Sequence, residues 1–197
     1  MNLFINTLKQ NIMKGIIIYK GKYGATRQYA EWIGNTLKLP VMLPEEITKE
    51  QIDNNDYLVI GTSVYFGKFK IGGWLNENAK LLYNKKLFFF IVNATAPGEQ
   101  AKRSKFIQDN ISGELRQKSE IYFLPGRLIH KDLDWKDKLI INMRGAMLKD
   151  PAKKKAIKAD LDEVKKENIA PIVKAVNAFN NLKSPPVTRT PNQQVIK

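Results

Sequence analysis

A short segment near the start of this 197-residue chain has the composition of an anion-binding loop. It follows an apolar run, Gly15–Tyr19, and leads into an amphipathic segment, Thr26–Lys38. A strand that enters a helix through a glycine-bearing loop brings backbone N–H groups together at the positive end of the helix dipole. The loop consists of Lys20, Gly21, Lys22, Tyr23, Gly24, Ala25 and Thr26. It matches neither a Walker loop nor G-x-G-x-x-G. The pattern predicts either a phosphate site or a plain strand-to-helix turn capped by Thr26.

Two later loops contain residues that suit a flat ring beside that phosphate. One follows the apolar run Tyr57–Gly61 and includes Ser63, Val64, Tyr65, Phe66 and Gly67. The other follows the apolar run Lys86–Val92 and includes Asn93, Ala94 and Thr95. Taken alone, the aromatic side chains would simply plug a strand end, and the second segment would be an ordinary loop. Open α/β sheets bind ligands outside the carboxyl ends of their strands. The three loops together therefore predict a site for a phosphorylated flat cofactor.

The elements that position these loops alternate between strand and helix. The predicted strands are 15–19, 41–43, 57–61, 86–92 and 120–124, and the predicted helices are 26–38, 74–82 and 99–117, with a helical turn at 48–52. The strands are continuously apolar, which is typical of a sheet covered on both faces. This alternation predicts a doubly wound α/β fold with a parallel sheet.

The last third of the chain departs from that alternation. Residues 131–149 mix apolar and basic side chains, and residues 152–182 have the periodicity of a long, Lys-rich helix that Pro171 should kink or break. We predict an N-terminal extension over 1–13, one domain over 14–183 and a disordered, Pro-containing tail over 184–197.

Composition limits the chemistry available to the chain. The absence of cysteine excludes disulfides, thiolate nucleophiles and Cys-ligated metals, and it fits a cytoplasmic protein. With a single histidine, His130, two-histidine metal motifs are excluded, and we predict no metal site. Thirty-three Lys and Arg against nineteen Asp and Glu give a net charge of +14, which predicts an anionic partner or ligand. No apolar run approaches the roughly 18 residues of a membrane span.

Two stretches carry a resemblance to a known family. Residues 16–33 and 56–67 resemble the corresponding segments of the flavodoxin family. More narrowly, Tyr65–Phe69 and the segment from Gly126 through Met147 resemble the flavodoxin-like menaquinone-dependent protoporphyrinogen dehydrogenases. The resemblance covers about residues 14–180 and implies a five-stranded parallel sheet of order 2-1-3-4-5 with a helical insertion after strand five.

The resemblance also implies FMN as the cofactor. Lys20 through Thr26 would hold its phosphate, Ser63 through Gly67 would border the isoalloxazine, and Asn93 through Thr95 would meet its other edge. The family usually has hydroxyl side chains where Lys20 and Gly21 stand, which removes donors worth about 1–3 kcal/mol each toward a charged group. Soluble flavodoxin carriers are typically acidic, whereas this chain is strongly basic.

These features favour an FMN-dependent two-electron oxidoreductase. The resemblance implies a quinone or redox protein as electron partner, a tetrapyrrole substrate, and peripheral contact with the inner face of the membrane through Trp135–Met147. The flavin ring performs such chemistry itself, so we assign no catalytic residue, and Asp132 and Asp134 are expected to be solvated or to cap a helix. The alternatives are a flavodoxin-type electron carrier and a cofactor-less basic binding module. Nucleic acid is a disfavoured partner because no recognised motif for it is present.

Overall fold

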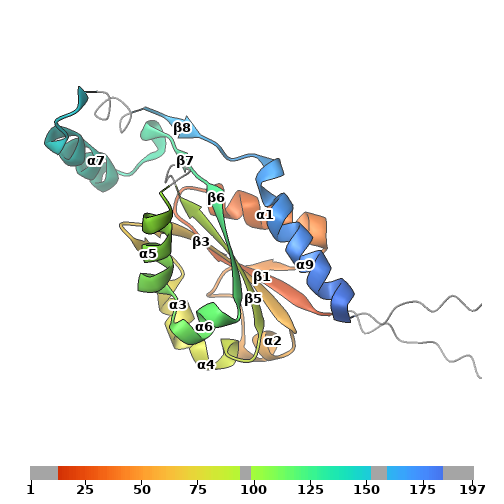
Figure 1. Cartoon of the computed structure of the whole chain (residues 1–197). Helices are drawn as coiled ribbons and strands as arrows, with labels where there is room; N and C mark the ends of the chain where they lie inside the picture. The colour runs from red at the N-terminus through yellow and green to blue at the C-terminus, as the bar shows by residue number, and fades with distance from the viewer. Residues whose placement is uncertain (1–12, 94–98, 152–158, 184–197) are drawn as a thin grey trace, which may run out of the picture.

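A computed structural model describes residues 13–93, 99–151 and 159–183 of the chain. Its centre is a parallel sheet in the order β2-β1-β3-β5-β6, with the short strand β4 (Lys68–Phe69) paired antiparallel to β3 (Figure 1). The parallel strands are β2 (Val41–Met42), β1 (Gly15–Lys20), β3 (Tyr57–Tyr65), β5 (Lys86–Asn93) and β6 (Ser119–Pro125). The predicted doubly wound fold and its 2-1-3-4-5 order are confirmed, with β5 and β6 as the fourth and fifth parallel strands.

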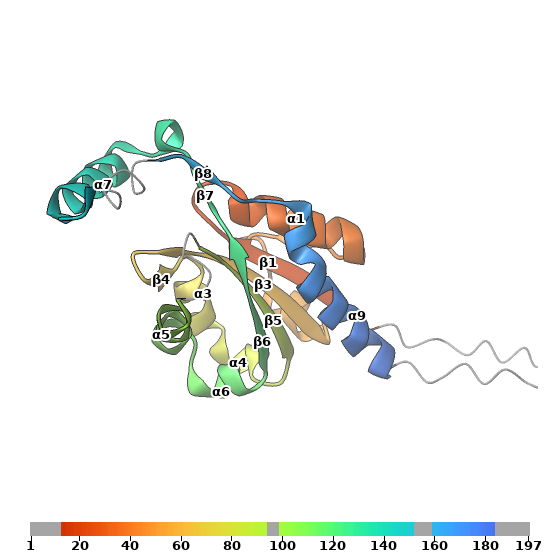
Figure 2. The ribbon, with the colours of Figure 1, turned by 45° about the horizontal axis from the view of Figure 1, so that its top comes forward.

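Helices cover both faces of the sheet, which explains why the strands are apolar throughout (Figures 1 and 2). On one face α1 and α9 pack against side chains such as Ile17, Val59 and Phe88. On the other face the helices from α2 to α6 cover side chains such as Ile18 and Leu58. The helices of these two layers are α1 (Ala25–Leu37), α2 (Lys49–Asp53), α3 (Gly72–Glu77), α4 (Ala79–Leu82), α5 (Gln100–Asn110), α6 (Gly113–Gln117) and α9 (Ala170–Lys183).

Strand β3 is four residues longer than predicted. Its last residues pair with β4 in a hairpin, with Val64 opposite Phe69 and Tyr65 opposite Lys68. The two turn residues, Phe66 and Gly67, have φ angles of 49° and 79°. Two positive φ angles in a two-residue loop match the twist of antiparallel strands. The aromatic segment is therefore a strand end and hairpin rather than an irregular loop.

Three predicted helices are broken in the structure. The helix predicted over 74–82 divides at Asn78, and the one over 99–117 divides at Ile111, which is extended and buried. The prediction of one long helix over 152–182 was wrong. Leu161–Asp162 form strand β8, Lys166–Ile169 form the 3₁₀ helix η2, and α9 begins only at Ala170. Pro171 thus lies in the first helical turn, where its missing N–H costs nothing.

The segment between β6 and α9 forms the predicted insertion, which we define as residues 127–162. It contains β7 (Arg127–Leu128), the 3₁₀ helix η1 (His130–Asp132), α7 (Trp135–Met147) and β8, and the two strands pair antiparallel. In both views α7 lies apart from the two helical layers, beyond the ends of the strands (Figures 1 and 2). Among the described residues, no helix is long and apolar enough to cross a membrane. The predicted extension and tail lie almost wholly outside the described residues.

Candidate functional site

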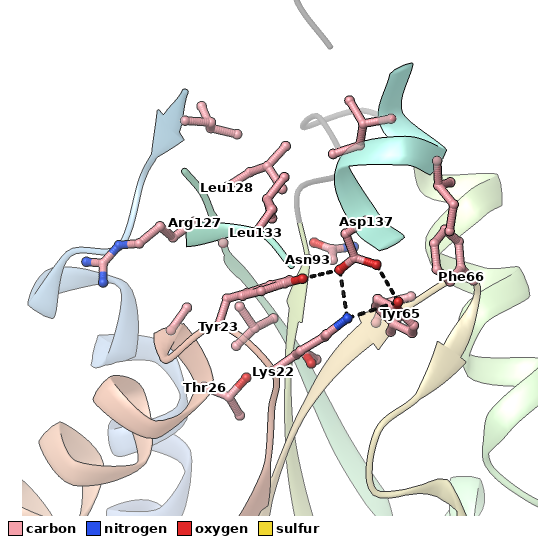
Figure 3. A pocket seen from close by; sticks show the side chains of 18 of the residues that line it. Lys22, Tyr23, Thr26, Tyr65, Phe66, Asn93, Arg127, Leu128, Leu133 and Asp137 are labelled. Atoms are coloured by element: carbon pink, nitrogen blue, oxygen red, sulfur yellow. Dashed lines mark hydrogen bonds and ion pairs between the residues drawn. The ribbon is translucent and has the colours of Figure 1, made fainter. Parts of the chain in front are cut away.

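A cavity of about 480 Å³ lies at the carboxyl edge of the sheet, between the strand-end loops and the insertion (Figure 3). This volume falls within the range of about 300–1,000 Å³ that is usual for small-molecule sites. The sheet side contributes Lys22, Tyr23, Ala25, Thr26, Ser63, Val64, Tyr65, Phe66, Val92 and Asn93. Lys102 and Gly126 also line the cavity, and the insertion contributes Arg127, Leu128, Leu133, Asp137, Ile140, Ile141, Ala159 and Leu161.

The first loop offers free backbone N–H groups to an anion. Gly24 is the N-cap of α1 with a φ of 81°, and no side chain of the described residues caps that helix. Its first-turn N–H groups are therefore open to an incoming acceptor. A Cβ at Gly21 would lie 2.5 Å from Thr26 Oγ1, so the chain comes close to the buried Thr26 only because glycine stands there. Glycine at position 21 therefore lets the loop backbone pack directly against Thr26 at the start of α1.

Lys20, the first cation of the predicted loop, points elsewhere. Its ammonium pairs with the Glu45 carboxylate, and this contact lowers the pKa of Glu45. The side chain does not line the cavity.

Lys22 does reach the cavity, where its ammonium meets the Asp137 carboxylate of the insertion (Figure 3). It also pairs with the Asp134 carboxylate. Its Nζ donates to Asp137 Oδ2 at 2.7 Å and to the Tyr65 hydroxyl at 3.0 Å, and it lies 2.8 Å from Asp134 Oδ2. Tyr65 in turn donates to Asp137 Oδ1 at 2.5 Å, and the Tyr23 hydroxyl donates to Asp137 Oδ2. Asp137 is 5% exposed, so all three partners surround a buried carboxylate.

The electrostatics of this cluster favour its charged form. Burial acts to raise the pKa of Asp137, but hydrogen bonds from Lys22, Tyr23 and Tyr65 outweigh it and hold the pKa below its usual value. Burial opposes the charge of Lys22, while Asp134 and Asp137 raise its pKa. Asp137 is thus an anion and Lys22 a cation at neutral pH.

Two buried polar groups line the cavity without a hydrogen-bond partner among the described residues. They are Ser63 Oγ and Asn93 Nδ2, at the ends of β3 and β5. Buried polar groups are rarely left unpaired, because each costs about 1–3 kcal/mol. Next to them Tyr65 and Phe66 make an edge contact with ring centroids 4.3 Å apart. A ligand with a flat ring and polar edges would pair both groups.

The structure brings most of the predicted site residues together. Those that line the cavity are Lys22, Tyr23, Ala25, Thr26, Ser63, Val64, Tyr65, Phe66 and Asn93. Gly21 and Gly24 shape the loop backbone, and Gly67 forms the hairpin turn. Ala94 and Thr95 lie outside the described residues.

Sequence reasoning missed the side of the cavity that the insertion forms. Apolar residues of the insertion make a roof above the strand ends. They are Leu128, Leu133, Ile140, Ile141 and Leu161. Asp134 was expected to be solvated or to cap a helix, and it does accept a hydrogen bond from Asp137 N at 2.8 Å as the N-cap of α7. That capping pattern is readable in the sequence, whereas its contact with Lys22, more than a hundred residues away, is not. His130 contacts Asp160 and does not line the cavity.

The strand order and the position of the cavity define a doubly wound α/β protein with a ligand site at the carboxyl edge of its sheet. A profile of the flavodoxin domain family matches residues 16–155, so the chain belongs to that family. Membership points to FMN as the cofactor and to electron transfer as the general chemistry. The open loop of α1 and the unpaired Ser63 and Asn93 fit such a group.

Solved structures give distant likenesses. The Trp repressor binding protein from Bacillus subtilis is 15% identical, with a TM-score of 0.47, over 70% of this chain and 99% of that one. A flavodoxin from the domain Archaea is 16% identical, with a TM-score of 0.41, over 66% of this chain and 96% of that one. A search of curated proteins found no match. At these scores the family match and the strand order carry the assignment.

Proposed function

We propose that this protein is an FMN-dependent two-electron oxidoreductase that resembles the quinone-linked protoporphyrinogen dehydrogenases. The observation that carries the proposal is the apolar roof, which makes a chamber of the edge of the sheet where the flavin is expected. A protein that only exchanges electrons with other proteins has no need of such a chamber. When bound, FMN supplies the acceptor for an electron pair from the substrate.

Different residues of the cavity would bind different parts of the cofactor. The backbone from Gly21 to Thr26 would bind the phosphate at the N-terminus of α1. Ser63 and Asn93 would donate to the polar edges of the ring, and Tyr65 and Phe66 would border its flat face. No described side chain has to act as a catalytic acid or base in this arrangement, because the protein's role is to bind, orient and exclude water.

The chamber also indicates the class of substrate. Its roof is apolar, and two cations, Lys102 and Arg127, line it as well. Arg127 is anchored by Asp162 at 2.8 Å. An apolar molecule that carries carboxylates, such as a reduced tetrapyrrole, would match both features, because apolar surfaces and anionic groups would each find a complement.

The outer face of α7 supports contact with a membrane that holds the quinone. Trp135, Leu139, Met143 and Met147 repeat every four residues and are 70%, 52%, 59% and 82% exposed. Lysines flank this stripe, at positions 131, 136, 138 and 149. An apolar stripe bordered by cations suits the interface of an anionic bilayer. We propose that the protein binds peripherally through this face.

Reconstitution tests the function directly. The chain is mixed with FMN and desalted, and oxidation of protoporphyrinogen is followed with a menaquinone analogue as acceptor. We expect retained flavin and turnover. Flavin that a reductase reduces without any turnover would instead identify an electron carrier, and a colourless, non-fluorescent product would overturn FMN binding.

Two variants of α7 separate the roof from the membrane face. Ile141→Asp places a charge in the roof and should abolish turnover while FMN stays bound. Leu139→Asp lies on the exposed stripe and should keep turnover with a soluble quinone but lose sedimentation with phosphatidylglycerol vesicles. Equal sedimentation of Leu139→Asp and the parent chain would refute the membrane contact.

A further inference from the structure

Lys22 has no donor to spare in this structure. A lysine ammonium carries three N–H donors. Asp137, Asp134 and the Tyr65 hydroxyl each lie within 3.0 Å of Lys22 Nζ. Lys22 can therefore donate a hydrogen bond to a phosphate in the adjacent loop only if it gives up one of these contacts.

The same contacts fasten the insertion to the sheet. Asp134 and Asp137 stand at the start of α7. Lys22 and Tyr23 lie in the loop after β1, and Tyr65 is the last residue of β3. Figure 3 shows these three side chains around Asp137. Asp137 is the most buried charged residue of the contact and accepts from all three side chains. The outer face of α7 is exposed, and Ile140 and Ile141 on its cavity side are only partly buried, so apolar burial does little to hold the helix in place. The carboxylate contact is accordingly a main attachment of α7 over the cavity.

We propose that Asp137 is a latch that holds α7 across the cavity and competes with the phosphate of an incoming ligand for Lys22. This inference rests on the proposed function, because it assigns a regulation to the same site. A bound phosphate ester draws Lys22 away from Asp137, so α7 is held less tightly over the cavity. Because the two effects are linked, a change that weakens the contact between Asp137 and Lys22 strengthens phosphate binding. Asp137 is thus a positioning residue, which acts on the ligand through Lys22.

The direction in which FMN affinity changes on substitution distinguishes a latch from a merely structural residue. Asp137→Asn removes the charge with little change of shape, and we expect FMN to bind about fivefold more tightly, the lower end of usual coupling between sites. Asp132→Asn is the matched control, because it makes the same change of net charge at an exposed position of the insertion. Weaker binding by Asp137→Asn, or binding equal to that of Asp132→Asn, would overturn the latch.

Amide hydrogen exchange tests the latch without FMN. In the ligand-free chain, Asp137→Asn should lose protection over residues 135–147, and Asp132→Asn should retain it. Inorganic phosphate, which is too small to touch the roof, should lower protection of α7 in the parent chain as it titrates the loop. Unchanged protection in both experiments would refute the latch. If FMN fails to bind any of the three chains, the proposed function fails, and these exchange data still decide the latch.

Discussion

The sheet and the insertion are held in place by different forces. Strands β1, β3 and β5 bury residues such as Ile17, Val59 and Phe88 completely, and helices cover them on both faces. Helix α7 leaves its outer face to solvent and meets the sheet through a cluster of charged and phenolic groups around Asp137. Apolar burial therefore sets the stability of the domain, while a few polar contacts set the position of the roof over the cavity. The two regions should respond to different perturbations.

The largest effect is expected from a cavity in the sheet. Phe88→Ala empties a fully buried position where the ring packs edge-on against Tyr57 and Phe179, with centroids 6.0 and 5.9 Å away. The free energy of unfolding should fall by about 3–5 kcal/mol, as is usual for a buried phenylalanine. Urea unfolding measures this change, and a loss below about 1 kcal/mol would mean that the sheet does not dominate stability.

The next largest effect is expected in the phosphate loop, where a substitution should weaken FMN binding. In Gly21→Ala the new Cβ would lie 2.5 Å from Thr26 Oγ1, so the loop must shift. FMN binding should weaken about tenfold or more, in line with the 1–3 kcal/mol that such overpacking costs. Titration of FMN fluorescence gives the dissociation constant. Gly72→Ala is the control, because its Cβ meets open space, and it should bind FMN like the parent chain.

Acidic pH should release the insertion before it unfolds the sheet. Asp137 has a lowered pKa, so its contribution is complete above the unfolded value of 3.8 and is lost as the pH falls through the folded value. Asp134 also has a lowered pKa and acts in the same direction, chiefly through Lys22. Hydrogen exchange of α7, with β5 as internal reference, should show protection at pH 6 that disappears below 3.8. Simultaneous loss in β5 would show that the two regions are not separable.

The pH above which the same contact weakens follows from the pKa values of its two tyrosines. Burial and Asp137 raise the pKa of Tyr23, and the hydrogen bond to Asp137 raises that of Tyr65. Groups with raised pKa values contribute fully below their unfolded value of 10.0 and lose that contribution only above it. The protection of α7 should therefore remain flat from pH 6 to pH 9, and a decline within that interval would contradict the assigned contacts.

The smallest effect on stability is expected on the outer face of α7. Met143→Ala removes a side chain that is mostly exposed and should change the free energy of unfolding by no more than about 0.5 kcal/mol. Measured beside Phe88→Ala in urea, it completes the contrast between the regions. A loss of 2 kcal/mol or more, the range of a buried methionine, would mean that the stripe is covered in the free protein.

Strands and loops of the sheet were predictable because their signals are local. The apolar runs at 15–19, 57–61 and 86–92 became β1, β3 and β5, and the glycine loop after the first run leads into α1 as expected. Where non-local contacts decide, prediction failed. β3 continues to Tyr65 because β4 pairs with it. Residues 161–162 form a strand rather than part of the predicted helix because they pair with β7.

The candidate site divides in the same way. Lys22, Tyr65 and Asn93 were predictable because they lie at or just after the carboxyl ends of strands that share one edge. Lys20 ends β1 two residues before Lys22, yet its partner is Glu45, which no spacing rule indicates. From the sequence, Asp137 is recognisable only as an acidic side chain in the first turn of a helix.

The order of residues alone determined a parallel α/β sheet and the edge at which its loops gather, because hydrophobic period and glycine placement act over a few residues. Tertiary structure alone decided that the insertion folds back over that edge and that its carboxylates meet Lys22. Contacts between segments more than a hundred residues apart depend on the path of the whole chain, and local patterns carry no record of it.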